Sequence, residues 1–374
     1  MAVTPRRRFR ATLFLSALIL LGGCSMPQQV QQRSPAEIRA QIVRLLPART
    51  ADRQGWATDI YAAFAALDIE PTTQNLCATL AVTEQESTFT ANPVVPGLAK
   101  IAREEIYRRA EEHGVPQLIV RGALMFSSHN GKSYDEQLAT VRTEQDLSRI
   151  YEEFIGSVPL GRRLLAGDNP VHTAGPMQVS IAFAEQYVRV HPYPYPVVGS
   201  IRHEVFTRRG GMYFGIAHLL GYPASYAQPL YRFADFNAGW YASRNAAFQQ
   251  AVSLASGIPI ALDGDLVRYD SIRDRGQIGT TEVAVRSLSR SLAMSDGQIH
   301  RALQQGESAK LERSELYQRV FALAERMERR PLLRAVIPRI ALHSPKITRK
   351  LTTDWYASRV DQRYRRCMAK ASAG

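Results

Sequence analysis

Helical periodicity over most of the chain is the feature that most limits its fold. The segment "LERSELYQRVFALAERME" (311–328) places Leu316, Val320, Leu323 and Met327 four, three and four residues apart. This spacing puts apolar side chains on one face of an α-helix. Similar patterns recur from residue 35 onwards, and no run alternates strictly enough to predict a strand. We therefore predict a mainly α fold.

Capping residues and helix breakers divide this helical region. It begins at "SPAEIRAQIVRLL", where Ser34 and Glu37 have the spacing of a capping box and Pro35 takes the first helical position. The strongest later break is "SGIPIALDGD" (256–265). We predict one domain over 35–256 and a helical, basic C-terminal region over 257–374.

The N-terminus has the layout of a secretory signal over 1–23. Four arginines precede the apolar run "ATLFLSALILL", which is too short for a permanent membrane anchor. Leu21, Gly22 and Gly23 resemble a bacterial lipobox, which implies cleavage before Cys24 and lipid attachment to it. Residues 24–34 are then a polar tether. The alternative is a soluble periplasmic protein with a conventional cleavage site nearby.

The residue after Cys24 and the charge of the chain bear on its location and partners. Ser25, rather than aspartate, follows the cysteine, which implies an outer-membrane lipoprotein facing the periplasm. The signal holds four of the 47 basic residues and none of the 34 acidic ones, so the mature chain keeps a net charge of about +9. A basic exported protein suits anionic cell-wall peptides or phospholipid headgroups, and we expect no nucleic-acid partner.

Two cysteines remain when Cys24 is lipidated. In an oxidising compartment Cys77 and Cys367 form a candidate disulfide. It would join the C-terminal tail to the helix expected around Glu86. The alternative is a pair of buried free thiols.

The stretch "TEQESTFTANP" (83–93) offers two carboxylates at a predicted helix end. Glu84 and Glu86 lie about 200° apart around an α-helix, so they cannot both face one cleft. Glu86 follows a mildly apolar stripe, where partial burial would favour its protonated form. A lone glutamate at a helix end is usually solvated, so the hypothesis that Glu86 is an acid needs support elsewhere.

Two later segments supply that support. "HTAGPMQVSIAFAEQY" (172–187) and "RFADFNAGWYASRNAAF" (232–248) each place small and amide residues just before a predicted helix. With the first stretch they resemble lytic transglycosylases, the lysozyme-like enzymes that cut peptidoglycan, and an uncharacterised lipoprotein family with the same motifs. The matching motifs occur in the family's order: Glu86-Ser87, Gly175-Pro176-Met177-Gln178, "GMYFGIAHLL" (211–220) and Asp235-Phe236-Asn237-Ala238-Gly239.

The resemblance implies a helical lysozyme-like domain with an insertion at about 95–170 and a C-terminal extension. It implies cleavage of the bond between N-acetylmuramic acid and N-acetylglucosamine, with Glu86 as the sole acid and base and 1,6-anhydro ends as products. No metal or cofactor is expected. The implied substrate-binding residues are Ser87, orienting Glu86 or the N-acetyl group; Gln178 and Asn237, giving amide contacts; Met177, packing against or beneath a sugar; and Gly175, Ala238 and Gly239, from the two turns.

The main departure from the family is Phe236, which replaces a tyrosine near the acid. Tyr231 or Tyr241 would have to substitute for it. A hydrolysing muramidase is the alternative enzyme, and it needs a second carboxylate, Asp168 or Asp235. A third alternative is a peptidoglycan-binding lipoprotein without catalysis.

Two further features remain open. The loop "HPYPYP" (191–196) offers Tyr193 and Tyr195 as sugar-stacking groups, although a structural proline-rich loop is the simpler interpretation. The pentapeptide "WYASR" occurs at 240–244 and again at 355–359. Because the flanking residues differ, we interpret the repeat as coincidence.

Overall fold

The structure is a computed structural model that describes residues 1, 33–157, 167, 169–267, 278–342 and 350–373. The predicted signal peptide, Cys24 and nearly all of the predicted tether lie outside these described residues. So do Asp168 and part of the predicted insertion.

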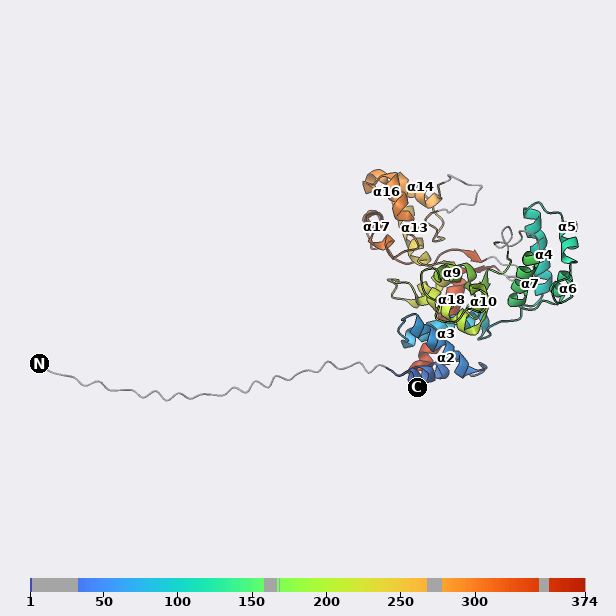
Figure 1. Ribbon diagram of the computed structural model, residues 1–374. Helices are drawn as coiled ribbons and strands as arrows, with labels where there is room; N and C mark the ends of the chain where they lie inside the picture. Colours follow the sequence, from blue (N-terminus) through green and yellow to red (C-terminus); the bar gives the residue numbers. More distant parts are fainter. Residues whose placement is uncertain (2–32, 158–166, 168, 268–277, 343–349, 374) are drawn as a thin grey trace. The chain divides into compact units, whose positions relative to one another are not determined.

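The regular secondary structure of the described chain is almost wholly α-helical, so the prediction of a mainly α fold is confirmed (Figure 1). The strands form two antiparallel pairs of two residues each, in which Thr173 pairs with Ser180 and Ala341 pairs with Thr352. These are β1 (Thr173–Ala174) with β2 (Val179–Ser180), and β3 (Ala341–Leu342) with β4 (Leu351–Thr352).

One large hydrophobic cluster joins the N-terminal helices, the middle of the chain and its last helix. Its main elements are α1 (Pro35–Leu45), α2 (Arg53–Ala66), α3 (Thr73–Ser87), α9 (Ile181–Tyr187), α10 (Ile201–Phe206), α11 (Arg208–Leu220), α12 (Pro229–Ala238) and α18 (Thr353–Ser372).

Helix α3 runs through this cluster, and its sequence explains both of its ends. The Thr72 side chain accepts a hydrogen bond from the backbone N–H of Asn75 at 3.1 Å, which caps the helix N-terminus. Residues 76–83 are all buried, as expected for a helix surrounded by others. Thr88 and Phe89 both adopt left-handed backbone conformations and end the helix. Glu86 therefore lies in the last turn of α3.

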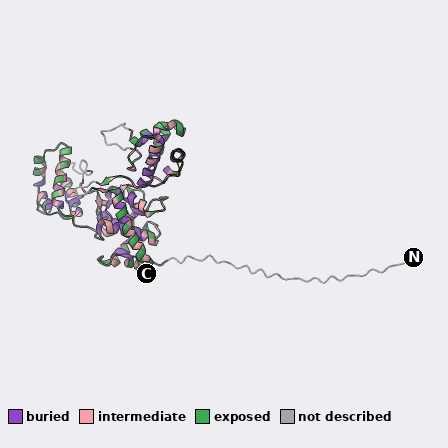
Figure 2. Ribbon diagram, turned by 180° about the vertical axis from the view of Figure 1, so that it is seen from behind, coloured by how far each residue is buried: buried purple, intermediate pink, exposed green. Residues whose placement is uncertain are grey.

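Residues 95–157 form four further helices, in the region where the sequence predicts an insertion. They are α4 (Leu98–Glu112), α5 (Gln117–Leu124), α6 (Tyr134–Thr140) and α7 (Glu144–Ser157). Their buried apolar side chains, apart from Ile155 of α7, belong to the large cluster, while α4 and α5 carry many exposed residues (Figure 2).

A second hydrophobic cluster lies between residues 247 and 324. It is formed by α13 (Ala242–Ser256), α14 (Thr280–Ser287), α15 (Ser289–Leu292), α16 (Asp296–Leu303), the short 3-10 helix η3 (Leu311–Arg313) and α17 (Glu315–Glu328). Helix α13 packs on both α14 and α17. This cluster thus takes in residues on both sides of the boundary predicted near residue 256.

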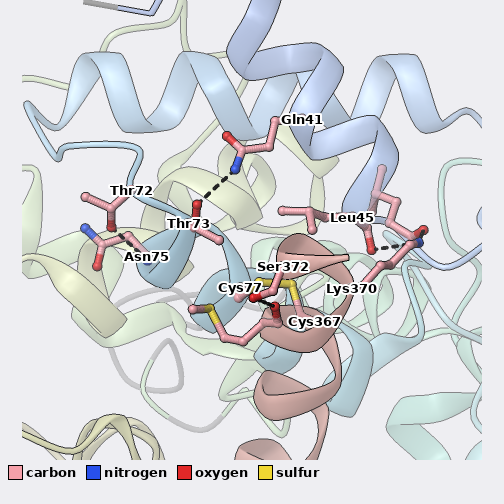
Figure 3. The surroundings of a disulfide bond; sticks show 11 residues. Gln41, Leu45, Thr72, Thr73, Asn75, Cys77, Cys367, Lys370 and Ser372 are labelled. Carbon is pink, nitrogen blue, oxygen red and sulfur yellow. Dashed lines mark hydrogen bonds between the residues drawn. A yellow bond between two sulfur atoms is a disulfide. The ribbon is translucent and has the colours of Figure 1, made fainter. Parts of the chain in front are cut away.

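The C-terminal helix α18 returns to the first cluster and packs on α3 and α12. Cys77 of α3 and Cys367 of α18 form a disulfide with a Cα–Cα distance of 5.5 Å. Figure 3 shows α1 at the same junction, where the Lys370 ammonium lies 3.5 Å from the Leu45 carbonyl oxygen. The same ammonium donates a hydrogen bond to the Leu46 carbonyl at 3.0 Å. The last helix is therefore fastened beside the helix that carries Glu86.

Candidate functional site

A cavity of about 1010 Å³ opens beside the C-terminal end of α3. Glu86, Gln178, Asn237, Ala238 and Gly239 all line it. These residues come from three segments that lie far apart in the sequence. The structure therefore brings five of the eight predicted catalytic and substrate-binding residues to one cavity.

The two carboxylates of the first motif face different surroundings. The Glu84 carboxylate lies 3.4 Å from the Arg366 guanidinium and 3.8 Å from that of Arg363, both on α18. Glu86 is partly buried and lines the cavity. Glu84 is thus part of the contact between α3 and α18, and Glu86 is the carboxylate that a ligand in the cavity would meet.

Tyr356 of α18 lies beside Glu86 at the cavity wall. Its buried hydroxyl makes no hydrogen bond of standard geometry among the described residues, yet it is close enough to interact electrostatically with the Glu86 carboxylate. Burial raises the pKa of Tyr356 well above its ordinary value, and the nearby charge of Glu86 raises that pKa further. Tyr356 therefore remains a neutral hydroxyl next to the candidate acid.

Sequence reasoning missed Tyr356 and considered Tyr231 and Tyr241 in its place. Neither of these residues is among the described residues that line the cavity. The Tyr241 hydroxyl instead donates to the Pro223 carbonyl at 3.0 Å, and the Tyr231 ring packs on Tyr226. Tyr356 lies in the second "WYASR" segment, but no local pattern relates that segment to Glu86.

Ser87 fixes the neighbouring turn instead of facing the cavity. Its buried hydroxyl donates to the Pro176 carbonyl at 2.8 Å, and the Thr83 carbonyl lies 3.2 Å from the same oxygen. In the structure Ser87 therefore links α3 to the turn at 175–178, and its role in orienting Glu86 or the N-acetyl group stays a prediction. Because this turn carries Gln178, the link positions the amide relative to Glu86.

Gly175 and Met177 pack the same turn against the protein interior. Gly175 has φ +74°, and a Cβ there would lie 2.2 Å from the Val205 carbonyl oxygen. Met177 is fully buried and packs against Gly215 of α11. Neither residue is among the described residues at the cavity wall. Met177 is thus buried against α11, and its packing against or beneath a sugar stays a prediction.

The Gln178 side chain is held at the wall by its own hairpin. Its amide nitrogen donates to the Gly175 carbonyl at 3.2 Å, and its amide oxygen accepts from the Thr173 hydroxyl at 3.1 Å. Gln178 itself has φ +48°, which is unusual for a residue with a side chain. The hairpin thus holds the amide in a defined position.

The Asn-Ala-Gly motif forms the end of α12 instead of a separate turn before the next helix. Asn237 and Ala238 are the last residues of this helix, and Gly239 ends it with φ +106°. The exposed Asn237 side chain accepts a hydrogen bond from the Thr353 hydroxyl at 3.0 Å. Helix α18 therefore holds this second amide as well as Tyr356.

Aromatic rings form much of the remaining wall. Phe183 contacts His218 and Trp240, with ring centroids 4.6 and 5.4 Å apart respectively. Tyr187 stacks on His191 at 4.1 Å. All five rings line the cavity, as does Phe236. Flat apolar faces beside amide groups suit a sugar, which presents both C–H and O–H groups.

His218 is a neutral member of this wall. Its Nε2–H donates to the Phe236 carbonyl at 3.3 Å. Burial lowers the pKa of His218 to about 4, and the hydrogen bond to Phe236 partly opposes that change. The imidazole therefore adds no positive charge to the cavity near neutral pH.

The predicted second carboxylates do not supply a partner for Glu86 in the described cavity. Asp235 is fully buried and accepts hydrogen bonds from the hydroxyls of Tyr222 and Tyr226 and from the backbone of Ser243, at 2.9, 2.8 and 2.6 Å. Asp168 lies outside the described residues. Among the described residues at the cavity, the other carboxylate is Glu307, which sequence reasoning missed because no motif marks it.

Tyr193 and Tyr195 belong to a packed aromatic group. The Tyr193 hydroxyl donates to Glu204 at 2.8 Å, and its ring stacks on Phe214 at 5.1 Å. Tyr195 packs against Tyr193 and Tyr213. Neither is among the described residues at the cavity, so the structure favours the interpretation of this loop as structural.

Two other features are absent from the part of the chain that the structure describes. Its residues include no group of three or more histidine, cysteine or carboxylate side chains arranged to hold a metal ion. The described helices include none that is long and apolar enough to cross a membrane.

The fold and cavity define a mainly α-helical protein with a large, partly aromatic cavity that contains carboxylate and amide groups. The chain belongs to the family described as "Protein of unknown function (DUF1615)", whose model matches residues 49–370. It is 52% identical over 361 residues to the Escherichia coli (strain K12) protein named "Uncharacterized protein YaiW", covering 96% of this chain and 98% of that protein. No solved structure matches the chain.

Proposed function

We propose that this protein cleaves peptidoglycan glycan strands by a lytic transglycosylase reaction with Glu86 as the single acid and base. The observation that carries the proposal is the convergence of Glu86, Gln178 and Asn237 on one cavity with an aromatic wall. The same proposal includes a lysozyme-like fold with an insertion in it. The resemblance of the motifs to those of lytic transglycosylases supports this part of the proposal.

The reaction needs one carboxyl group that transfers a proton twice. Protonated Glu86 gives its proton to the glycosidic oxygen as the bond between that oxygen and the muramyl C1 breaks. The substrate's N-acetyl group stabilises the positive charge that develops at C1. Glu86 then takes the proton of the muramyl 6-hydroxyl, whose oxygen bonds to C1. The products are a 1,6-anhydro end and a new hydroxyl, and no water is consumed.

The surrounding side chains have separate roles in this proposal. The amides of Gln178 and Asn237 hydrogen-bond to sugar groups, because both face the cavity from fixed positions. The faces of Phe183 and Trp240 contact the apolar faces of the sugar rings. Tyr356 donates to the Glu86 carboxylate after the first proton transfer, which stabilises the anionic intermediate state.

The proposal includes attachment to the outer membrane through lipid on Cys24. Such an anchor would keep the cavity near the peptidoglycan, its proposed substrate. Labelling of cells with radioactive palmitate tests it: wild type should incorporate label and fractionate with outer membranes, and Cys24→Ala should do neither. Equal labelling of both proteins would contradict the anchor.

Digestion of purified sacculi tests the proposed reaction. The mature protein should release muropeptides with 1,6-anhydro ends, identified by mass spectrometry, and Glu86→Gln should release none. Glu84→Gln is the matched control, since Glu84 lies on the same helix but pairs with α18. This variant should retain activity.

The same experiment separates the alternatives. Products with reducing ends would indicate a muramidase, in which a second carboxylate activates water. Binding to sacculi without product release by any variant would indicate a wall-binding protein. Either result would contradict the transglycosylase proposal.

A further inference from the structure

Glu307 is a second carboxylate at the cavity, and the proposed reaction does not use it. It lies on the loop between α16 and η3, and its side chain is exposed. A ligand that fills the cavity would therefore meet both Glu86 and Glu307.

The loop that carries Glu307 is held by an arginine in the interior. Arg244 is fully buried, and its guanidinium donates to the carbonyls of Gly306 and Ser308, the second at 2.8 Å. Asn245 also donates to the Gly306 carbonyl, at 3.1 Å. The carbonyl groups of the residues before and after Glu307 are thus held by hydrogen bonds, so the start of the Glu307 side chain has a fixed position at the cavity wall.

The surroundings of Glu307 include other negative charges. Burial raises the pKa of Asp265, and the charges of Asp263 and Glu307 raise that pKa further. These electrostatic interactions require Asp263 and Glu307 each to lie near Asp265. Glu307 therefore places a negative charge at this part of the cavity wall.

We propose that Glu307 is a specificity-determining residue that disfavours glycan strands with free lactyl carboxylates. This inference rests on the proposed function, because it concerns the same cavity and substrate. The lactyl group of N-acetylmuramic acid is uncharged when an amide bond joins it to a stem peptide. Removal of the peptide leaves a carboxylate close to the sugar ring, which Glu307 repels.

The inference gives the protein a place in a sequence of reactions. Its substrate would be a strand that still carries stem peptides, whose own charges lie further from the sugar rings. Cleavage would therefore precede hydrolysis of the amide between the lactyl group and the peptide. Strands already stripped of peptides would be poor ligands.

Calorimetric binding to two oligosaccharides tests this selectivity. The ligands are chitohexaose, which is neutral, and peptide-free glycan hexasaccharides, which have a lactyl carboxylate on every second sugar. The protein is the mature chain, which carries Glu86→Gln so that neither ligand is cleaved, and it is kept in detergent. Glu307→Gln is added to this protein, and Glu111→Gln, an exposed change on α4, is the matched control.

We expect the parent protein to bind the neutral ligand more tightly than the anionic one. Glu307→Gln should narrow that affinity ratio by about three- to tenfold at low salt, less at high salt, and Glu111→Gln should leave it unchanged. An unchanged ratio in Glu307→Gln would overturn the inference alone. Failure of the parent to bind either ligand would overturn the proposed function and the inference together.

Discussion

The Tyr356 side chain of α18 lies against the Glu86 carboxylate of α3, although 270 residues separate them in the sequence. The contact supplies a hydroxyl next to the candidate acid, where Phe236 provides only a ring. Because α18 also holds Asn237 through Thr353, this helix contributes Tyr356 to the cavity wall and fixes a second residue of that wall.

Tyr356→Phe should lower the rate of anhydro-muropeptide release by about tenfold, because the variant loses one hydrogen bond to a charged carboxylate. The ring remains, so the melting temperature should change little. Tyr364→Phe is the control, since its ring packs on Phe233 of α12 and it should digest sacculi at the wild-type rate. Equal rates for Tyr356→Phe and wild type would show that the hydroxyl has no part in the reaction.

Removal of the disulfide should lower the free energy of unfolding by about 3–5 kcal/mol, because the bond closes a loop of 290 residues in the unfolded chain. Urea unfolding of wild type and of Cys77→Ala/Cys367→Ala measures the difference. A reducing agent should destabilise wild type and leave the double variant unaffected. Coincident unfolding curves for the two proteins would contradict this prediction.

Gly175→Ala should destabilise the protein by more than about 2 kcal/mol, because strain at positive φ adds to a clash with the Val205 carbonyl. Gly114→Ala is the matched control. Its φ of +71° is nearly the same as +74° at Gly175, but no atom lies within 4 Å of the position that a Cβ would take. Only strain of about 1 kcal/mol is expected there. Urea unfolding that shows equal losses for both variants would rule out the proposed steric role.

His218 should make the protein less stable as pH falls from about 6.5 to about 4. The folded pKa of about 4 lies below the unfolded value of 6.5, so the unfolded chain takes up the proton first. The free energy of unfolding should fall by up to about 3 kcal/mol over this window. Protonation of His218 should cause no further fall at lower pH. Urea unfolding across this range should show a smaller loss for His218→Phe. An NMR titration of His218 centred near pH 6.5 would refute the assignment.

Local geometry explains the parts of the site that the sequence predicted. The helical period predicted the fold class, and the spacing of Glu84 and Glu86 put the two carboxylates in different surroundings. The motifs around Gln178 and Asn237 marked the segments that meet Glu86. The fold class and the separation of Glu84 from Glu86 depended on residues within a few positions of one another, where backbone geometry fixes direction. The segments of Gln178 and Asn237 were instead indicated by the resemblance of their motifs to those of lytic transglycosylases.

Long-range packing decided the rest. Sequence determined the helices, the pair of cysteines that form the disulfide and the residues near Glu86. Only the tertiary structure placed Tyr356 and Glu307 at the cavity, buried Asp235 among hydroxyl groups and turned Ser87 towards Pro176. These contacts join segments separated by up to hundreds of residues, and no local pattern encodes which helix faces meet. Burial of the apolar faces of α3, α12 and α18 in one core places Tyr356, and Arg244 of α13 holds the loop that carries Glu307.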